Sequence, residues 1–421
     1  MFATLKLMSR NQFPDDFLWG GSTASHQVEG NTHNQWSEWE KVHAQDLAQT
    51  AEKRLKWLPN WSDIQAQATD PANYLSGNGI EHYSRYADDF KLLKQLNLNA
   101  FRFSIEWSRL EPVEGQWDET EIDHYRRYIA ELNKLHIEPV LTFWHWTMPV
   151  WFIQKGGFEK KANLVFFDRF VQKVTEELCQ NLHYVMVLNE PNVYVNIGYL
   201  QGAWPPMRKS LIKTLQVYSN LAKAHRRAYQ IIKSINPKLS VGIAAQISYI
   251  RPLNKRNPVN KLSVKVGNYI FNWWYLNRYH QLDFIGLNYY FSAYVNWYGA
   301  QKNPPKPVND LGWFMQPADV GLLLERLWEK YHKPLIVTEN GLADANDSYR
   351  QWWLEQTITA MQTALSHGVN LFGYLHWSLL DNFEWASGWW PKFGLIAVDR
   401  ASMRRTIRPS AKWLAKKIKS N

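Results

Sequence analysis

Eight short runs of apolar, β-branched and aromatic residues recur along the chain, and each run is nearly continuous in its hydrophobicity. The runs are FLWGGSTA from Phe17, AFRFSIEW from Ala100, PVLTFWHW from Pro139, YVMVLNE from Tyr184, SVGIAAQ from Ser240, FIGLNYY from Phe284, LIVTEN from Leu335 and LFGYLHW from Leu371. Strands of a parallel sheet have this pattern when both faces of the sheet are covered. The sequence therefore predicts eight buried, parallel strands.

Helical spacing separates most of these runs. Apolar residues three or four positions apart define one face in each of four segments, which are Tyr86–Leu93, Ile122–Leu132, Phe167–Leu178 and Val320–Tyr331. Asp118, with Glu121 three residues later, is typical of a capping box at the start of the second segment. Strands that alternate with helices in this way predict an α/β fold, a single (β/α)8 TIM barrel.

The chain shows no low-complexity linker and no break in composition that would mark a second domain. A single barrel with insertions can hold about 400 residues, so residues 1–421 are expected to form one domain. The segments 40–78 and 251–272 are long for connections. We expect them to be elaborated βα loops of that barrel.

The chain is basic, with a formal net charge of +10. Basic residues cluster at Arg251–Lys265 and Arg400–Lys419, and such clusters can indicate contact with nucleic acid or an anionic membrane. Because the remaining basic residues are spread along the chain, a solvated positive surface is the simpler interpretation. We expect neither a nucleic-acid nor a membrane partner, and the sequence leaves the oligomeric state open.

The sequence contains one cysteine, Cys179, so an intrachain disulfide is excluded. Cys179 lies in an amphipathic helical pattern, which predicts a buried thiol and suits a reducing compartment. No apolar run approaches the roughly 20 residues that span a bilayer, and the N-terminus lacks the apolar core of a signal peptide. These features predict a cytoplasmic protein.

Polar and aromatic residues collect where the predicted strands end. They are Arg102 and Glu106, His145 and Trp146, Asn189 and Glu190, Asn288 to Tyr290, Glu339 and Asn340, and His376, Trp377, Asp381, Asn382, Glu384 and Trp385. The carboxyl ends of barrel strands meet at one face, which is where barrel enzymes place their active sites. One such residue is commonly a cap or a loop ligand, but six strands that end this way predict a shared site.

Two of these residues, Glu190 and Glu339, end strands that face each other across the predicted barrel mouth. Facing carboxylates suit glycoside hydrolysis, in which one protonates the leaving oxygen and the other attacks the anomeric carbon or activates water. The alternative is that each carboxylate only forms a salt bridge with a base such as Arg102. Trp146, Trp377 and Trp385, beside polar groups at strand ends, favour a sugar site because indole rings pack against sugar C–H faces.

Seven motifs then carry a family resemblance. They are FLWGGSTASHQVEG (17–30), RFSIEWSRLEP (102–112), HW (145–146), LNEP (188–191), NYY (288–290), VTENG (337–341) and WSLLDNFEW (377–385). In this order they resemble glycoside hydrolase family 1, the β-glucosidase family, across essentially the whole chain. The resemblance implies a single catalytic (β/α)8 barrel.

The resemblance also implies a mechanism. Glu190 would be the acid/base and Glu339 the nucleophile, which gives net retention through a covalent glycosyl-enzyme. The family geometry places two such carboxylates about 5 to 5.5 Å apart, the separation of retaining enzymes. Glu339 would be the anion, and its charge would raise the pKa of Glu190 so that Glu190 starts protonated.

The same resemblance implies a set of binding residues. Asn189 would hydrogen-bond the sugar 2-hydroxyl, and Trp377 would form the floor under the ring. Arg102 and Tyr290 would contact Glu339, with Asn288 in support. The other implied substrate contacts are Gln27, His145 and Glu384 to the remaining hydroxyls together with Trp385, and Trp146, Trp313 and Phe393, of which Trp313 would be the platform for the leaving group. No metal and no cofactor is implied.

The expected substrate class follows from family residues that are present in this chain. Glu384 and Trp385 are present where phospho-sugar members of the family differ, so unphosphorylated sugars are expected. Glu190 is present where the thioglucosidase branch has glutamine, which favours O-glycosides. The expected activity is that of a retaining exo-β-glycosidase on terminal glucosyl residues, with galactosyl or fucosyl also accepted. The alternatives are a transglycosylase with the same intermediate and a non-catalytic carbohydrate-binding barrel.

Some positions depart from the family pattern. Thr147 and Glu40 stand where aspartate is common, and Val185 stands where tryptophan is usual. We expect these changes to alter packing and the shape of the cleft. The unusual stretch Gly388–Pro391 lies where the rim of the site is expected, and it leaves the preferred leaving group open.

Overall fold

The computed structural model describes residues 13–296, 299–300 and 307–420, and its centre is a closed barrel of eight parallel strands. Around the barrel the strands are β1 (Leu18–Ser22), β2 (Ala100–Ser104), β3 (Glu138–Trp144), β4 (Tyr184–Asn189), β5 (Ser240–Gln246), β7 (Phe284–Tyr289), β10 (Leu335–Asn340) and β11 (Leu371–Trp377), which pairs again with β1. Each strand coincides with one predicted apolar run. The predicted (β/α)8 barrel is therefore confirmed.

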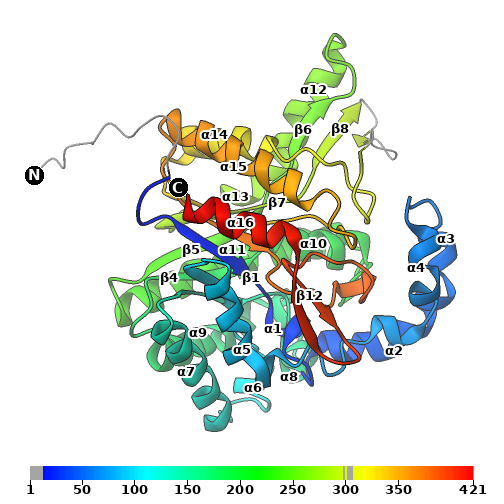
Figure 1. The fold of residues 1–421 in the computed structure, drawn as a ribbon. Helices are drawn as coiled ribbons and strands as arrows, with labels where there is room; N and C mark the ends of the chain where they lie inside the picture. The colour runs from blue at the N-terminus through cyan, green and yellow to red at the C-terminus, as the bar shows by residue number, and fades with distance from the viewer. Residues whose placement is uncertain (1–12, 297–298, 301–306, 421) are drawn as a thin grey trace, which may run out of the picture.

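Helices surround the barrel and fill its loops (Figure 1). They are α1 (Ser25–Val28), α2 (Gln35–Gln49), α3 (Ala51–Leu55), α4 (Trp61–Ala68), α5 (His82–Gln95), α6 (Trp107–Leu110), α7 (Glu119–Lys134), α8 (Val150–Gln154), α9 (Leu164–Leu178), α10 (Pro191–Val195), α11 (Leu211–Ile235), α12 (Pro258–Gly267), α13 (Trp274–Leu276), α14 (Asp319–Tyr331), α15 (Arg350–Ser366) and α16 (Pro409–Lys419). Short helical turns are η1 (Pro71–Tyr74), η2 (Gly157–Glu159), η3 (Lys161–Asn163), η4 (Asn196–Gln201), η5 (Asn268–Trp273) and η6 (Trp385–Ser387). The four helices predicted from periodicity correspond to α5, α7, α9 and α14.

Two small sheets complete the fold. One pairs β6 (Tyr249–Pro252), β8 (Ser292–Asn296) and β9 (Gly299–Ala300), and the other pairs β12 (Ile396–Asp399) with β13 (Arg404–Ile407). In Figure 1, α12 projects from the top of the molecule beside β6 and β8. The segments 40–78 and 251–272 both lie in connections that follow barrel strands, after β1 and β5, as the sequence predicted.

An apolar layer of side chains from alternate strand positions packs inside the barrel. The layer consists of Ala100, Val140, Met186, Ala244, Phe284, Ile336 and Leu375. Side chains two residues apart on a strand share a face, so Arg102 follows Ala100 into the interior, nearer the carboxyl end. The floor of the site is therefore this packed apolar layer.

Val185 lies on the other face of β4. It belongs to the large cluster that packs the barrel against its helices, whereas Met186 belongs to the interior layer. The departure at Val185 therefore affects strand–helix packing and leaves the cleft unchanged. Cys179 is buried, as predicted, and burial raises the pKa of its thiol.

The capping box predicted for α7 is only half formed. Asp118 accepts hydrogen bonds from the backbone amides of Thr120 and Glu121, at 2.9 and 3.2 Å. The amide of Asp118 donates to the carbonyl of Leu110, and the Glu121 carboxylate accepts from the Tyr83 hydroxyl. A tertiary contact with α5 thus replaces the reciprocal half of the motif. Within the described residues, none of the helices combines the length and hydrophobicity needed to cross a membrane.

Candidate active site

Irregular pairing at the ends of β4 and β10 places the carboxyl groups of Glu190 and Glu339 at the barrel mouth. The register with a neighbouring strand shifts between Met186 and Asn189 in β4 and between Val337 and Glu339 in β10. Such bulges turn the following side chains and are frequent beside active sites. Glu190 itself adopts a left-handed backbone with a φ of 40°. Adjacent residues of a regular strand point to opposite faces, so these features allow Asn189 and Glu190 to face one site.

Glu339 is held from two sides. Its Oε1 accepts a hydrogen bond from Nη1 of Arg102, and its Oε2 accepts one from the hydroxyl of Tyr290 at 2.6 Å. Arg102 and Glu339 are both buried, so this ion pair is shielded from solvent. Removing one member of a buried pair typically costs about 3 to 5 kcal/mol, since the remaining charge is left uncompensated. Arg102 and Tyr290 therefore fix the position of the Glu339 carboxylate.

Arg102 extends the network to Asn189. The guanidinium donates from Nη2 to Oδ1 of Asn189 at 2.6 Å and from Nε to Oγ1 of Thr142 at 3.0 Å. Asn288 donates from Nδ2 to the same Asn189 oxygen at 3.2 Å and to Oε1 of Glu190 at 2.8 Å. A continuous chain of side chains thus joins the two predicted catalytic residues.

Glu190 lies in an environment that favours its neutral form. Burial and the negative charge of Glu339 raise the pKa of Glu190 well above its usual 4.5, while the hydrogen bond from Asn288 and the charge of Arg102 oppose the rise. A carboxyl with these surroundings keeps its proton to a higher pH than an exposed carboxyl does. The arrangement therefore combines one carboxylate in an ion pair with one carboxylic acid.

His145 is neutral and its tautomer is set by its neighbour. Burial, with the charge of Arg102, lowers the pKa of His145 well below its usual value. Because Oδ1 of Asn189 accepts from Arg102, its Nδ2 donates to Nε2 of His145 at 3.0 Å. The imidazole proton is then on Nδ1, which has no hydrogen-bond partner among the residues that the structure describes.

Glu384 and Gln27 offer two further unpaired polar atoms, Oε2 and Oε1 respectively. Gln27 is oriented by donating from Nε2 to the carbonyl of Phe383 at 2.6 Å and to Oδ1 of Asn382 at 3.1 Å. Burial and the charge of Glu339 raise the pKa of Glu384 to about 8. Buried polar atoms usually have partners, so one donor and two acceptors on these three residues suit a ligand rich in hydroxyls.

Aromatic side chains form the walls of the site. The Trp377 ring stacks on His145 with centroids 5.8 Å apart, and Trp385 lies 6.0 Å from His145 and 4.9 Å from Trp146. The indole of Trp146 donates to the carbonyl of Asn189 at 2.9 Å. These contacts place the predicted tryptophans around the polar network.

A second aromatic group adjoins the first. Tyr290, Trp313 and Phe393 have ring centroids 5.8 to 6.1 Å apart, and they share an apolar cluster with Trp377. Tyr290 also contacts Glu339, so this group borders the reacting centre. The polar network and the two aromatic groups together join most of the predicted site residues. Three other polar residues that were expected at the site lie in separate networks: Asn340 accepts from Trp353, His376 contacts Tyr374, and Asp381 pairs with Arg408.

Sequence analysis missed the residues that orient this arrangement. Thr142 accepts from Arg102, and Thr338 donates to Oδ1 of Asn288 at 2.6 Å. Each is the one hydroxyl residue of its strand and follows an apolar run, which is the signal that could have found it. Trp36, on α2, and Trp204, after η4, also pack against Trp385, with ring centroids 4.7 and 6.3 Å away, and the sequence did not predict their positions.

Two of the departures have structural partners. Glu40 accepts from Nε2 of His26 at 2.7 Å and from the hydroxyl of Ser76 at 2.6 Å, and the His26 ring stacks on Trp385. Thr147 donates to Glu106 at 3.0 Å. Glu40 therefore supports a wall of the site through His26.

The stretch Gly388–Pro391 does not contribute free indoles to the rim. Trp389 is buried and donates to the carbonyl of Leu75 at 2.8 Å, and Trp390 is buried in a cluster with Leu58 and Ile64. These tryptophans hold the α3–α4 excursion against the C-terminal loop. The preferred leaving group stays open.

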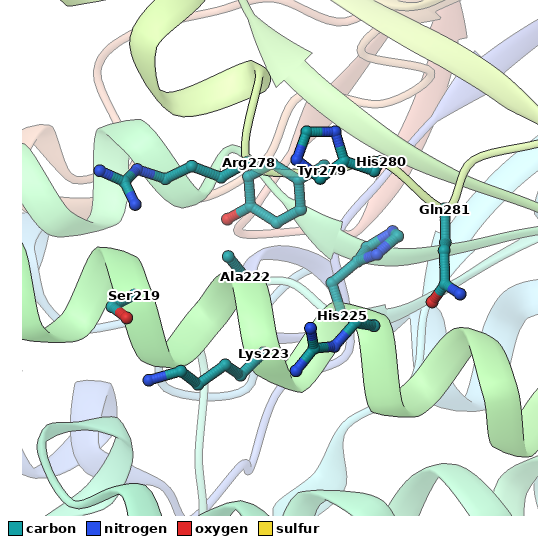
Figure 2. Close-up of a pocket in the computed structure, with 9 residues that line it drawn as sticks. Ser219, Ala222, Lys223, His225, Arg278, Tyr279, His280 and Gln281 are labelled. Carbon is teal, nitrogen blue, oxygen red and sulfur yellow. The ribbon is translucent and has the colours of Figure 1, made fainter.

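A separate cavity of about 270 Å³ lies outside this network (Figure 2). Lys223 and His225 of α11 face Arg278, Tyr279 and Gln281 across it, and its lining contains no carboxylate. It holds none of the predicted site residues. Its described lining therefore offers no pair of carboxylates like that at the barrel mouth.

Comparison with known proteins agrees with this geometry. The sequence model of Glycosyl hydrolase family 1 matches residues 9–284 and 279–421. Beta-glucosidase A of Acetivibrio thermocellus is 28% identical, covering 98% of this chain and 100% of its own. A chloroplastic galactolipid galactosyltransferase of Arabidopsis thaliana is 29% identical, covering 81% of this chain and 58% of its own. The solved structure of a beta-glycosidase from Pyrococcus horikoshii is 32% identical with a TM-score of 0.84, covering 96% of this chain and 94% of its own.

The barrel, the facing carboxylates and a family match along nearly the full length support one assignment. The catalytic class follows from relatives that match this chain from end to end. The chain belongs to glycosyl hydrolase family 1, and it is a glycoside hydrolase of the β-glucosidase type.

Proposed function

We propose that this protein is a retaining exo-β-glycosidase that removes terminal β-D-glucosyl residues from unphosphorylated O-glycosides, with residues 1–421 acting as one catalytic domain. Glu339 is the nucleophile and Glu190 the acid/base. The observation that carries the proposal is that the two carboxyl groups lie in different electrostatic environments. Glu339 is in an ion pair with Arg102, whereas burial and the charge of Glu339 raise the pKa of Glu190.

In the first step the Glu339 carboxylate attacks the anomeric carbon while the bond from that carbon to the leaving oxygen breaks. Glu190 transfers its proton to this oxygen, so the alcohol leaves neutral. Arg102 and Tyr290 aim Glu339 before the sugar arrives, because both contact its oxygens in the free enzyme. Asn189 is held by Arg102 and Asn288, and it would meet the sugar 2-hydroxyl.

In the second step the charge of Glu339 is absent because it is esterified. The pKa of Glu190 then falls, since that charge is one of the causes of its rise. Glu190 can now take a proton from water, whose oxygen attacks the anomeric carbon and releases Glu339 as a carboxylate. Two displacements at one carbon return the sugar with its β-configuration.

The sugar preference rests on the unpaired polar atoms. The Nδ1 proton of His145 donates, whereas Gln27 Oε1 accepts, and Glu384 is close to half-protonated near pH 8. A monosaccharide ring with free hydroxyls complements this set, while a phosphate would face a carboxyl group at Glu384. Because Gln27 and Glu384 can each contact neighbouring hydroxyls, galactosyl and fucosyl residues are accepted as well. Trp377 lies under the ring, and Trp313 with Phe393 contacts the leaving group.

A transglycosylase is the second candidate. It uses the same glycosyl-enzyme but transfers the sugar to an acceptor alcohol, and one relative of this chain is named as a galactosyltransferase. The ratio of transfer product to free sugar in the presence of an acceptor distinguishes the two. A non-catalytic carbohydrate-binding barrel is disfavoured, because Glu190 and Glu339 are both present and both oriented by hydrogen bonds.

The test is a panel of aryl β-glycosides followed by NMR. We expect the glucoside to be hydrolysed fastest and the β-anomer of the free sugar to appear first, before mutarotation. Initial release of the α-anomer would rule out retention. The Glu190→Gln and Glu339→Gln variants serve as controls for the background rate.

A further inference from the structure

The helix α12 and the turn η5 that continues it turn their apolar side chains toward solvent. Val259, Leu262, Val266, Tyr269 and Ile270 are 48% to 60% exposed. These residues recur at spacings of three and four positions, so they form one stripe along the helix. Large exposed apolar patches mark interaction surfaces in proteins.

The face of this helix that points to the protein is polar instead. Asn260, Asn268 and Asn272 are buried there. Asn272 donates to the carbonyl of Ser248 at 2.9 Å, and its Oδ1 accepts from the Ser248 amide at 3.3 Å. Rolling the helix to bury its apolar stripe would break these buried amide hydrogen bonds. The outward orientation of the stripe is therefore fixed by the fold.

Basic residues predominate in the sequence around the helix, and five of them pair with acidic residues of other segments. Between Pro191 and Leu282 the chain contains fourteen lysines and arginines and no aspartate or glutamate. Lys261 and Lys265 are exposed on α12 itself, interleaved with the apolar stripe. Lysine next to exposed aliphatic residues on one helix is the pattern of helices that lie in a membrane interface.

A second group of exposed apolar side chains lies earlier in the sequence than α12. Leu211, Ile212 and Leu215, at the start of α11, are 63%, 78% and 48% exposed. The segment before α11 follows β4, and α12 lies in the connection that follows β5, the neighbouring strand of the barrel. Both apolar regions therefore belong to connections at the end of the barrel where the active site lies.

A groove of about 590 Å³ runs between α12–η5 and α14. Lys265, Arg326 and Lys330 line it together with the apolar parts of Val264, Tyr269 and Trp273, and Glu329 contributes one carboxylate. Three cations against one anion leave the groove positive. Such a groove suits the phosphate of a lipid headgroup.

We propose that the face formed by α12 and η5 binds the surface of a lipid bilayer that carries anionic headgroups. A second copy of this chain would bring the same positive charge to the contact and repel it. A nucleic acid would leave the apolar stripe facing water. A bilayer surface meets both features, since its headgroups match the lysines and its acyl region matches the stripe.

The binding is independent of the reaction, but it has a consequence that rests on the proposed function. Docking through α12 brings the barrel mouth close to glycosides whose leaving group is anchored in the membrane. The enzyme would then act on amphiphilic β-glycosides at the bilayer surface. The binding experiment below does not depend on that activity, so the two can fail separately.

The test uses the full chain and sedimentation with vesicles of phosphatidylcholine, either pure or with about 30 mol% phosphatidylglycerol. We expect binding to the anionic vesicles that weakens as salt is added, because the lysine contribution is screened. Absence of binding, or equal binding to both vesicle types, would overturn the proposal.

Two double variants separate the apolar and the charged contributions. Leu262→Glu with Val266→Glu should lower vesicle partitioning at least about 100-fold. Lys261→Gln with Lys265→Gln should lower it roughly 25-fold, since each lysine near an anionic surface contributes about fivefold. Val42→Glu and Val165→Glu change valines on α2 and α9 that are 71% and 52% exposed, and they should leave binding unchanged. All variants should hydrolyse a small aryl glucoside at the same rate.

Sedimentation velocity addresses the competing occupant. A dimer that Leu262→Glu abolishes, together with no vesicle binding by the unaltered chain, would assign the face to a second copy and contradict the proposal. A monomer that binds anionic vesicles supports it.

Discussion

Asn288 donates a hydrogen bond from Nδ2 to Oε1 of Glu190 over 2.8 Å. This bond favours the charged form of Glu190, and it opposes the burial and the Glu339 charge that raise the pKa. Asn288 is itself oriented by Thr338, the residue before Glu339. The readiness of Glu190 to give up its proton is therefore tied to the strand that carries the nucleophile.

Asn288→Ala should raise the pKa of Glu190 further. The alkaline limb of kcat/KM should move to higher pH, because the lost hydrogen bond had favoured the carboxylate. We expect kcat/KM at the optimum to fall about 10- to 100-fold through lost positioning of Glu190 and Asn189. Thr338→Val keeps the Asn288 donor and should shift the limb less. A limb that moves to lower pH would contradict this account.

Glu339→Gln should lower the pKa of Glu190. It removes the negative charge that follows burial among the causes of the raised value. A ¹³C-carboxyl NMR titration of the variant against the unaltered enzyme, with Glu190→Gln to assign the resonance, measures the shift. An unchanged Glu190 titration would mean that the two carboxyls are not coupled.

Glu339→Ala should lower hydrolysis of an activated aryl β-glucoside by at least about 10,000-fold, because the nucleophile is gone. Added azide should restore turnover and give the α-glycosyl azide, since the small anion enters from the face that Glu339 occupied. Rates near those of the unaltered enzyme without azide would remove Glu339 from the mechanism.

Glu384→Gln should flatten the pH dependence of stability. Burial and the Glu339 charge raise the pKa of Glu384 from 4.5 to about 8. A carboxyl with a raised pKa binds more protons in the folded state, so its stabilising contribution is complete below pH 4.5 and is lost as pH rises through about 8. Urea unfolding at several pH values should show a smaller decrease in the free energy of unfolding for the variant. Parallel pH curves would contradict the raised pKa.

Glu40→Gln should weaken sugar binding without changing the chemistry. Glu40 holds His26, whose ring stacks on Trp385 with centroids 5.6 Å apart. We expect KM for a β-glucoside to rise about five- to tenfold with kcat nearly constant, since the wall contacts substrate and transition state alike. Glu38→Gln, on the exposed side of the same helix, is the matched control. Equal effects on kcat and kcat/KM would instead assign Glu40 to the reacting centre.

The positions of the barrel strands could be predicted because both faces of such strands are buried, which makes each hydrophobic run continuous. The start of α7 was also predictable from Asp118. The hydrogen bond that Glu121 accepts was not predictable, because its partner Tyr83 comes from another helix. Local sequence patterns predict contacts within one helix, such as the cap formed by Asp118, but they do not predict contacts between two helices.

Motifs predicted which residues form the candidate site, whereas they did not predict the backbone geometry that brings these residues together. The bulges in β4 and β10 that bring Asn189, Glu190 and Glu339 to one mouth depend on pairing with neighbouring strands. Thr142 and Thr338 were missed because a hydroxyl in an apolar run gives little sign of its partner. Such orienting contacts become visible only in three dimensions.

The expectation that the chain has no membrane partner stays a prediction, and the sequence features behind it have two limits. Net charge averages over the chain, so it conceals a segment from Pro191 to Leu282 without one acidic residue. The apolar periodicity of α12 fits a buried stripe as well as an exposed one. The buried amides of Asn268 and Asn272 decide between them, and only the structure places those amides.

The central claim is that Glu339 becomes covalently attached to the sugar. An aryl 2-deoxy-2-fluoro-β-D-glucoside with a good leaving group tests it. Fluorine at C2 slows both formation and release of the glycosyl-enzyme, and the good leaving group speeds formation alone, so the glycosyl-enzyme accumulates. Mass spectrometry of the digested enzyme should find one fluoroglucosyl group, on the peptide that contains Glu339. An adduct on any other residue, or turnover with no adduct at all, would contradict the account.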